Sequence, residues 1–251
     1  MVDKAKYSAP ALDKGLDILE LLTNARDGMS QNHIAVALDR TVSEIFRMLV
    51  TLERRGYVVV DQPGDLYRIS PKLFELSHRH PPTRFLIECA YPVLREIAET
   101  LRQSCHLVQY HDGDMVVMAM ADSPGTSSYS LNIGARVPVL RTSSGYVVLA
   151  FQADAAERNR MIEHAAGTSP DDFDAILARI RTQGFEEADS LEVMGVRNLS
   201  FPIFGPAATA IAAITVPFLA RIGPDAVSIE AARELLAAKH LEISRRVSAV
   251  V

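Results

Sequence analysis

Near the N-terminus, apolar residues recur every three or four positions in three segments, the spacing that places them on one face of a helix. The first segment covers residues 12–22. The second follows Ser30, whose hydroxyl can cap it, and ends at Asp39, a residue type that tolerates the left-handed conformation of a tight turn. The third covers residues 42–55, and we expect Gly56 to end it. This pattern predicts three short helices.

A β-type pattern follows the third helix. Residues 57–60 and 66–69 are rich in Val, Tyr and Ile, and Pro63-Gly64-Asp65 provides a turn between them. The order helix, helix, turn, helix, hairpin is that of a winged helix-turn-helix. In such a domain the third helix enters the major groove of DNA.

The rest of the chain mixes helical and strand patterns, which predicts an α+β fold. Residues 78–82 interrupt the pattern with two prolines, so we predict a boundary between a DNA-binding domain at 1–80 and a second domain at 81–251. In the second domain we expect helices at 83–102, 142–151, 155–165, 170–183 and 228–247, strands within 105–133 and at 198–203 and 209–216, and a loop at 134–138.

Composition is that of a soluble globular protein, with 48% hydrophobic and 23% charged residues. The first ten residues lack an apolar stretch, and the most apolar tract, 207–220, is shorter than the roughly 20 residues that span a bilayer. We therefore expect a cytoplasmic protein without membrane contact. The net charge is -5, but residues 1–80 carry equal numbers of basic and acidic side chains. Such a domain can bind DNA if its cations gather on one face.

The start of the third helix carries the residues expected to contact DNA: Arg40, Thr41, Ser43, Glu44 and Arg47. Arg47 lies four residues after Ser43, so both project from one face, where Arg can bind guanine or phosphate. Glu44 has two interpretations. It accepts a hydrogen bond from a cytosine amino group, or it forms an ion pair with Arg47 on the same helix.

A loop at 134–138 leads to a second candidate site at the start of the helix that Thr142 can cap. Free backbone N–H groups at Ser143, Ser144 and Gly145, with the positive end of the helix dipole, suit a carboxylate or phosphate. Arg141 adds a positive charge. The residues alone favour an ordinary capped helix that binds no ligand.

Two segments of the first domain resemble the IclR family of bacterial regulators. Residues 11–19 (ALDKGLDIL) are similar to that family's opening helix, and residues 43–57 (SEIFRMLVTLERRGY) resemble its recognition helix and the glycine-aromatic stop. Glu44 stands where the family commonly has Thr, and Thr41-Val42 where it has Pro-Lys. These departures suggest an altered operator sequence.

The resemblance continues in the second domain, in residues 134–145 (GARVPVLRTSSG), 195–202 (GVRNLSFP) and 212–217 (AAITVP). It implies that the helix at 142–151 lines an effector pocket, that Asn198, Thr215 and Pro217 face the ligand, and that Ala188 or Asp189 lies on a loop that often contributes an acid. Pro217 lacks a hydroxyl that family members use, so the effector is expected to differ from the small keto acids bound there.

Fold and partners follow from the same resemblance. It implies a winged helix-turn-helix followed by a GAF-like effector domain, a curved antiparallel sheet flanked by helices. The expected function is a transcriptional repressor controlled by a small organic acid, without a cofactor. The expected partners are double-stranded DNA with a roughly palindromic operator and a second copy of the chain, as a homodimer or a tetramer built from two dimers.

Two alternatives remain open at this stage. An enzyme could use Cys105-His106 as nucleophile and base, or hold a metal with His111, but neighbours on a strand point to opposite faces. We expect instead a buried Cys105, a hydrogen-bonded His106, no catalytic residue and no metal. The other alternative is a constitutive DNA-binding protein whose C-terminal domain only oligomerises, which an absence of ligand-induced thermal stabilisation would indicate.

Overall fold

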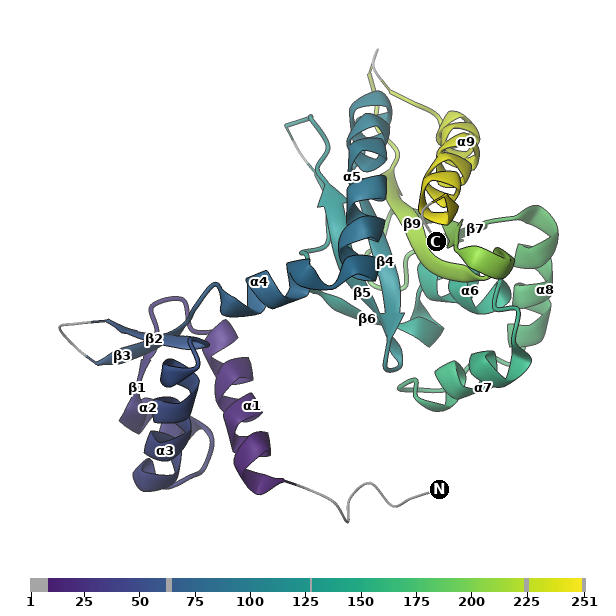
Figure 1. The fold of residues 1–251 in the computed structure, drawn as a ribbon. Coiled ribbons are helices and arrows are strands. Elements are labelled where there is room, and N and C mark those ends of the chain that lie inside the picture. Colours follow the sequence, from purple (N-terminus) through teal and green to yellow (C-terminus); the bar gives the residue numbers. More distant parts are fainter. Residues whose placement is uncertain (1–8, 62–64, 127, 224–225, 250–251) are drawn as a thin grey trace. The chain divides into compact units, whose positions relative to one another are not determined.

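A computed structural model describes residues 9–61, 65–126, 128–223 and 226–249 (Figure 1). The chain divides into two compact units, Met1–Arg84 and Phe85–Val251. The division falls within a helix that begins at Pro81. The predicted turn residues Pro63 and Gly64 lie outside the described residues.

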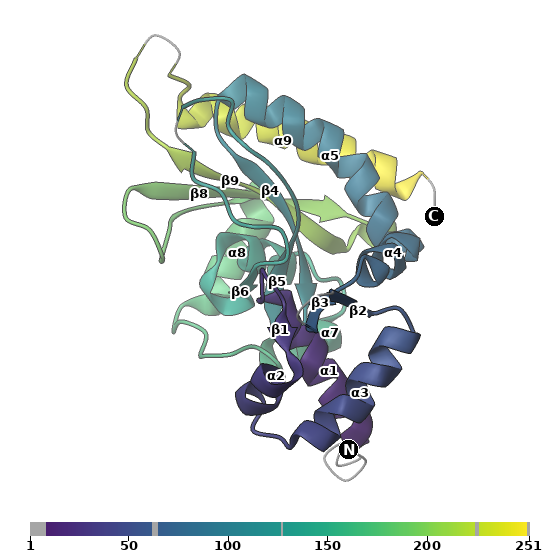
Figure 2. The same ribbon diagram turned by 90° about the vertical axis from the view of Figure 1, so that its left-hand side faces the viewer.

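The N-terminal unit packs three helices against a three-stranded sheet. Ile18, Ile34, Ile45 and Leu49 are fully buried at its centre, so each helix turns its apolar face inward. The predicted winged helix-turn-helix is confirmed. Its elements are α1 (Pro10–Thr23), β1 (Met29–Ser30), α2 (Gln31–Ala37), α3 (Val42–Arg54), β2 (Val58–Asp61) and β3 (Leu66–Ile69), with sheet order β1-β3-β2 (Figure 2).

A fourth helix, α4 (Lys72–Arg79), follows the hairpin, and the sequence pattern does not predict it. None of its residues is buried, and its eight residues are fewer than the window over which helical periodicity can be recognised. After His80 the chain enters α5 (Pro81–Leu101). The predicted break at 78–82 therefore covers only His80. The two prolines lie in the first turn of α5, where a backbone N–H would have no acceptor within the helix, so the N–H that proline lacks is not needed there.

A six-stranded antiparallel sheet forms the centre of the C-terminal unit, in the order β6-β5-β4-β9-β8-β7. α5 and α9 lie side by side on one face, which we term the α9 face (Figure 2). α6 and α8 pack on the other, the α6 face. The remaining elements are β4 (Cys105–His111), β5 (Asp114–Ala121), β6 (Arg136–Pro138), α6 (Ser143–Ala150), α7 (Ala155–Glu163), α8 (Phe173–Gln183), β7 (Glu186–Asp189), β8 (Val196–Phe204), β9 (Ala210–Leu219) and α9 (Ile229–Ser248).

Strand alternation divides the buried side chains between these two faces. On β9, Ile214 and Val216 pack with α5 and α9, whereas Ala213 packs with the helices of the α6 face. Thr215, two residues beyond Ala213, therefore lies on the α6 face. This assignment places the candidate ligand-binding residues described below.

The two edge strands differ from the prediction. Residues 136–138 were expected to form a loop, but they pair with β5 as β6, with Met115 opposite Val137. β7 replaces the loop expected around Asp189 and pairs with β8. Both strands are short, as edge strands commonly are. β6 has only three residues and ends in a proline, and β7 has a single apolar residue, so neither gives a clear apolar alternation.

Candidate nucleic-acid interface and effector site

The solvent-exposed side of α3 carries both polar and apolar side chains. Ile45 and Leu49 are buried against α1 and α2, which leaves the opposite side of the helix in solvent. Ser43 and Arg47 are exposed on that side. Phe46, which sequence reasoning missed, is also half exposed at 50%. An exposed apolar residue outside the buried stripe was the available signal, since it can contact a thymine methyl group in the major groove.

A capping box fixes the start of α3. The Thr41 hydroxyl accepts a hydrogen bond from the backbone N–H of Glu44, and Glu44 Oε2 accepts from the backbone N–H of Thr41 at 3.0 Å and from its hydroxyl at 2.8 Å. Two backbone donors of the first turn are thereby satisfied. Thr41, a predicted DNA contact, is exposed but its side chain is held by this box.

Glu44 also reaches across to α1. Its Oε1 lies 2.6 Å from Nζ of Lys14, and this hydrogen bond is the largest cause that lowers the pKa of Glu44 to about 2. The predicted ion pair with Arg47 is therefore wrong. The carboxylate turns toward the N-terminus of its own helix, where backbone donors and the positive end of the dipole favour it, rather than toward the C-terminus.

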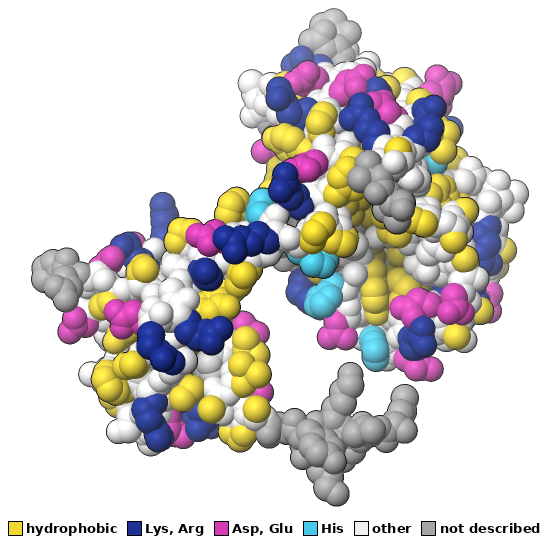
Figure 3. Space-filling view, viewed as in Figure 1, with side chains coloured by type: hydrophobic (Ala, Val, Ile, Leu, Met, Phe, Trp, Pro, Cys, Tyr) yellow, Lys and Arg dark blue, Asp and Glu magenta, His cyan; other side chains and the backbone are white. Residues whose placement is uncertain are grey.

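Arg40 and Arg47 are both exposed, and neither guanidinium has an ion pair or hydrogen bond to another described residue. Arg54 and Arg55, at the end of α3, are exposed in the same way. Figure 3 shows basic side chains intermixed with hydrophobic ones on one face of the N-terminal unit. Free guanidinium groups of this kind can bind phosphate or guanine without first breaking an internal pair.

The turn between α2 and α3 is held at both ends. Asp39 adopts a left-handed conformation with φ of 50°, as its position predicts. Gln31, at the start of α2, donates a hydrogen bond from Nε2 to the carbonyl of Val42 at 3.0 Å. Sequence reasoning missed this second contact, which joins residues eleven positions apart.

In the C-terminal unit, Thr142 caps α6 as predicted. Its hydroxyl accepts a hydrogen bond from the backbone N–H of Gly145 at 3.2 Å, so the expectation of a free N–H at Gly145 is wrong. Gly145 itself packs so tightly that a Cβ would lie 2.0 Å from the carbonyl oxygen of Val139. Ser143 and Ser144 are buried at the same helix start, and their backbone N–H groups have no intrahelical acceptor.

Arg141 lies just before this helix and points into solvent. Its guanidinium is 3.6 Å from Oε1 of Glu192, and both side chains are more than half exposed. An exposed pair of this kind contributes little to stability. Arg141 therefore remains available as a charge near the helix start.

The sheet brings together three of the predicted ligand-binding residues. Asn198 of β8 lies opposite Pro217 of β9, and Ser200 lies opposite Thr215. Directly opposite residues share a face, and residues two apart on a strand do so too, so Asn198, Ser200 and Pro217 lie on the α6 face with Thr215. The hydroxyls of Ser200 and Thr215 are 2.8 Å apart and form a buried hydrogen bond. Sequence reasoning missed Ser200, although its spacing of two from Asn198 on a strand was a signal.

Asp189 does not join this group. It lies opposite Arg197 on β7, one residue beyond the position that pairs with Asn198. Because successive side chains on a strand alternate, Asp189 and Arg197 point to the α9 face. The neighbouring Glu187 binds Arg197 at 3.0 Å and Arg233 of α9 at 2.7 Å, which confirms the direction of that face.

Cys105 and His106 point to opposite faces of β4. Cys105 is buried on the α9 face, and its thiol donates to the carbonyl of Leu94 at 3.0 Å. His106 is only 5% exposed, and it has no hydrogen bond to any residue in the described ranges. The expectation of a hydrogen-bonded His106 stays a prediction. Burial lowers the pKa of His106 to about 4.

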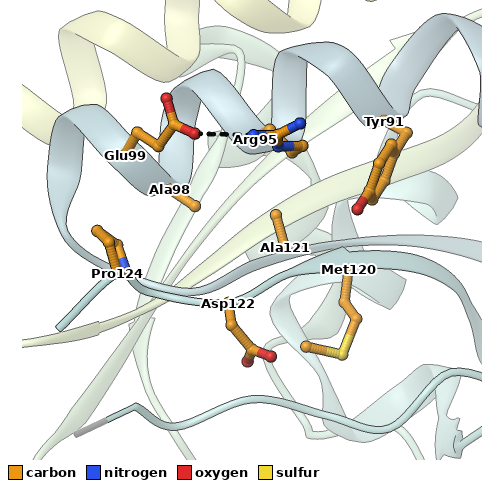
Figure 4. A pocket seen from close by; sticks show the side chains of 8 residues that line it. All are labelled: Tyr91, Arg95, Ala98, Glu99, Met120, Ala121, Asp122 and Pro124. Atoms are coloured by element: carbon orange, nitrogen blue, oxygen red, sulfur yellow. Dashed lines mark hydrogen bonds and ion pairs between the residues drawn. The ribbon is translucent and has the colours of Figure 1, made fainter. Parts of the chain in front are cut away.

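A cavity of about 300 Å³ lies on the other side of the sheet, between α5 and the end of β5 (Figure 4). In it Arg95 is paired with Glu99 at 3.2 Å. Figure 4 shows Ala121 turned toward α5 and Met120 turned away from it. Because Met120 lies opposite His106, this view supports the placement of His106 on the α6 face.

Within the described part of the chain, no cluster of three or more His, Cys, Asp or Glu side chains is placed to hold a metal ion. A search of the same residues finds no helix with the length and apolar character needed to cross a membrane.

Comparison with protein families gives two matches along this chain. Residues 11–62 match the IclR helix-turn-helix domain, and residues 83–245 match the model described as bacterial transcriptional regulator IclR C-terminal. The second match alone covers more than half of the sequence.

Individual relatives match nearly the full length. The HTH-type transcriptional regulator BhcR of Paracoccus denitrificans is 30% identical over 241 residues, which are 90% of this chain and 85% of that protein. The crystal structure of HmgR from Pseudomonas aeruginosa is similar with a TM-score of 0.75 at 23% identity, covering 96% of this chain and all of that one. An IclR homolog from Microbacterium hydrocarbonoxydans, complexed with 4-hydroxybenzoate, gives a TM-score of 0.77 at 18% identity, covering 94% and 98%.

Proposed function

Since the chain belongs to the IclR family of bacterial transcriptional regulators, we propose that α3 binds operator DNA and that the α6 face binds a small carboxylic acid that controls this binding. We assign the DNA-binding role to residues 1–80 and the effector-binding and oligomerisation role to residues 81–251. A protein that acts on bacterial genes works in the cytoplasm.

The single observation that carries the DNA-binding assignment is the outer surface of α3. It exposes Ser43 and Arg47, while Lys14 and Thr41 hold the carboxylate of Glu44, in the first turn of α3, in internal contacts. Repulsion between Glu44 and DNA phosphates is thereby reduced. Arg47 supplies base or phosphate contacts, and Arg40 adds a phosphate contact at the preceding turn.

The effector assignment rests on the N-terminus of α6 and the polar row on β8 and β9. The backbone N–H groups of Ser143 and Ser144, with the helix dipole and the charge of Arg141, suit a carboxylate. Asn198 and Thr215 lie on the sheet face against which α6 packs. A ligand held by both elements would couple the position of α6 to the sheet.

The oligomeric state and the direction of control are also proposals. A helix-turn-helix dimer reads two half-sites about one helical turn apart, so we propose a homodimer, or a pair of dimers, on a roughly palindromic operator. We propose that the protein represses transcription and that the effector releases it from DNA. No step of this action requires catalysis or a cofactor.

A gel-shift titration tests the proposal with the full chain and the DNA upstream of its own gene, at fixed salt because affinity for DNA depends on it. Nanomolar binding that a member of an organic-acid panel weakens is the expected result. DNA binding with no response to any acid, together with no thermal stabilisation by any, would favour the constitutive alternative instead.

A further inference from the structure

Another cavity, of about 530 Å³, lies beside α9 at the end of the sheet where β7 begins. Its volume is within the range of about 300–1,000 Å³ that small-molecule sites occupy. None of the residues proposed to bind the carboxylic acid lines it, so it is separate from the proposed site on the α6 face. Most of its lining is apolar: Phe151, Phe185, Phe201, Phe204, Ala237 and Leu241.

The aromatic rings of the lining pack against one another in two pairs. Phe185 and Phe201 are stacked, with ring centroids 5.1 Å apart and planes at 16°, whereas Phe151 and Phe204 meet edge to face at 5.4 Å. The ring of His240 joins the pairs, at 5.1 Å from Phe201 and 6.3 Å from Phe204. Such walls offer ring faces and edges to a planar aromatic ligand.

His240 gives this apolar lining a hydrogen-bond acceptor. Its Nδ1 lies 2.9 Å from the carbonyl oxygen of Pro202, and a carbonyl only accepts, so Nδ1 carries the hydrogen. Burial lowers the pKa of His240, which keeps the ring neutral at neutral pH. Nε2 is then an acceptor, and no described residue donates to it. A ligand with one O–H or N–H donor would satisfy this atom.

The charged residues of the lining do not favour an anion. The guanidinium of Arg233 lies 2.7 Å from Oε2 of Glu187 and covers the ring of Phe185 at 5.6 Å, so its charge is already paired. Glu234 adds an exposed negative charge to the same wall. A carboxylate would be repelled by Glu234 without gaining a free cation, so the lining suits a neutral molecule.

The surface around the cavity does not resemble a contact between two copies of the chain. Leu241 is the only large apolar side chain that α9, which is described throughout, exposes, and its exposed neighbours one turn away are Ala238 and Arg245. A stable interface buries about 800 Å² on each partner around an apolar centre. The apolar surface here is concave and small, which suits a small molecule.

We propose that this cavity binds a small neutral aromatic molecule with one O–H or N–H donor, of the phenol or indole class, and that the donor binds Nε2 of His240. Because the cavity is separate from the α6 face, this inference does not depend on the proposed carboxylate site. Phe151 follows the last residue of α6, so a ligand here contacts the end of α6 opposite to the one proposed to bind the acid.

Indole is the first probe, because the chain has no tryptophan and the emission of indole can be recorded without a protein background. Titration of the full chain is expected to give a shifted emission and a Kd below about 1 mM. Ala237→Leu places a larger side chain in the cavity and is expected to weaken binding at least about tenfold. Ala238→Leu, at the next and exposed position of α9, is the matched control and keeps the affinity.

Phenol and toluene test the role of His240, since they have nearly the same shape but only phenol donates. His240→Phe keeps an aromatic wall without Nε2. Calorimetric titration of this variant is expected to show phenol weakened by about threefold to tenfold relative to toluene, the effect of one hydrogen bond. Should His240→Phe fail to fold, His240→Asn, which can still donate to Pro202 but lacks Nε2, is expected to give the same relative loss.

Three results would overturn the inference. The first is that neither indole nor phenol binds at millimolar concentration, and the second is that Ala237→Leu binds indole as tightly as the unchanged chain. The third is an equal change for phenol and toluene in the His240 variant. If Ala237→Leu instead alters the oligomeric state measured by sedimentation and no aromatic compound binds, the cavity receives a second copy and the proposal is wrong. Each result leaves the proposed carboxylate site on the α6 face unaffected.

Discussion

Lys14 Nζ lies 2.6 Å from Oε1 of Glu44, so an ion pair joins α1 to the first turn of α3. The other carboxylate oxygen of Glu44 completes the capping box with Thr41. One side chain thereby fixes both the start of the proposed DNA-binding helix and its attachment to the helix that supports it.

The ion pair with Lys14 predicts that the pKa of Glu44 depends on the residue at position 14. Replacing Lys14 by Met removes the largest cause that lowers the pKa of Glu44, so that pKa should rise from about 2 toward 4.5. NMR titration of the Glu44 carboxyl carbon measures it, and Lys14→Arg, which keeps the charge, is the control. An unchanged pKa in Lys14→Met would contradict the ion pair.

Thr41→Ala, which removes the cap itself, should lower the free energy of unfolding by about 1 kcal/mol.

Arg47 should contribute strongly to operator binding. Arg47→Ala is expected to weaken it by about tenfold to a hundredfold, because a guanidinium in the major groove contributes about 1–3 kcal/mol. Arg55→Ala is the matched control, an exposed arginine at the other end of α3 that has no ion pair to any residue the structure describes. Gel-shift titration at fixed salt measures both. Equal losses from the two variants would mean that Arg47 adds only general positive charge.

Gly145 should not tolerate a methyl group. Gly145→Ala places a Cβ 2.0 Å from the carbonyl oxygen of Val139, so it should destabilise the C-terminal unit by about 1–3 kcal/mol or more. Gly15→Ala is a matched helical control because its Cβ meets nothing within 4 Å, and it should stabilise α1 by up to about 1 kcal/mol. Denaturant unfolding of the two proteins should give opposite signs. A neutral Gly145→Ala would argue against the close contact.

His106 should make the protein sensitive to acid. Burial lowers the pKa of His106 from 6.5 to about 4, so between these values the unfolded chain binds more protons than the folded one. Its contribution is fully present above pH 6.5 and is lost as the pH falls toward 4, by roughly 3 kcal/mol in all. His106→Leu should show a shallower fall in unfolding free energy over this range. Urea unfolding at several pH values tests this, and parallel curves for the two proteins would refute it.

The sequence predicted an element or a cap correctly where the residues that determine it lie close together in the chain. The apolar spacing of α1 and α3, the left-handed Asp39 and the Thr142 cap depend on residues within a few positions of each other. β6, β7 and α4 have three, four and eight residues, too few to show a periodic pattern, and these elements were accordingly missed.

The sequence by itself determined that a winged helix-turn-helix precedes an α+β domain, and which helix presents Ser43 and Arg47. Only the tertiary structure decided that Glu44 binds Lys14, that Asp189 points away from Asn198, and that His106 lies buried beside Thr215. Helix periodicity is a property of neighbours along the chain, whereas partners and strand faces depend on register between segments that are many residues apart.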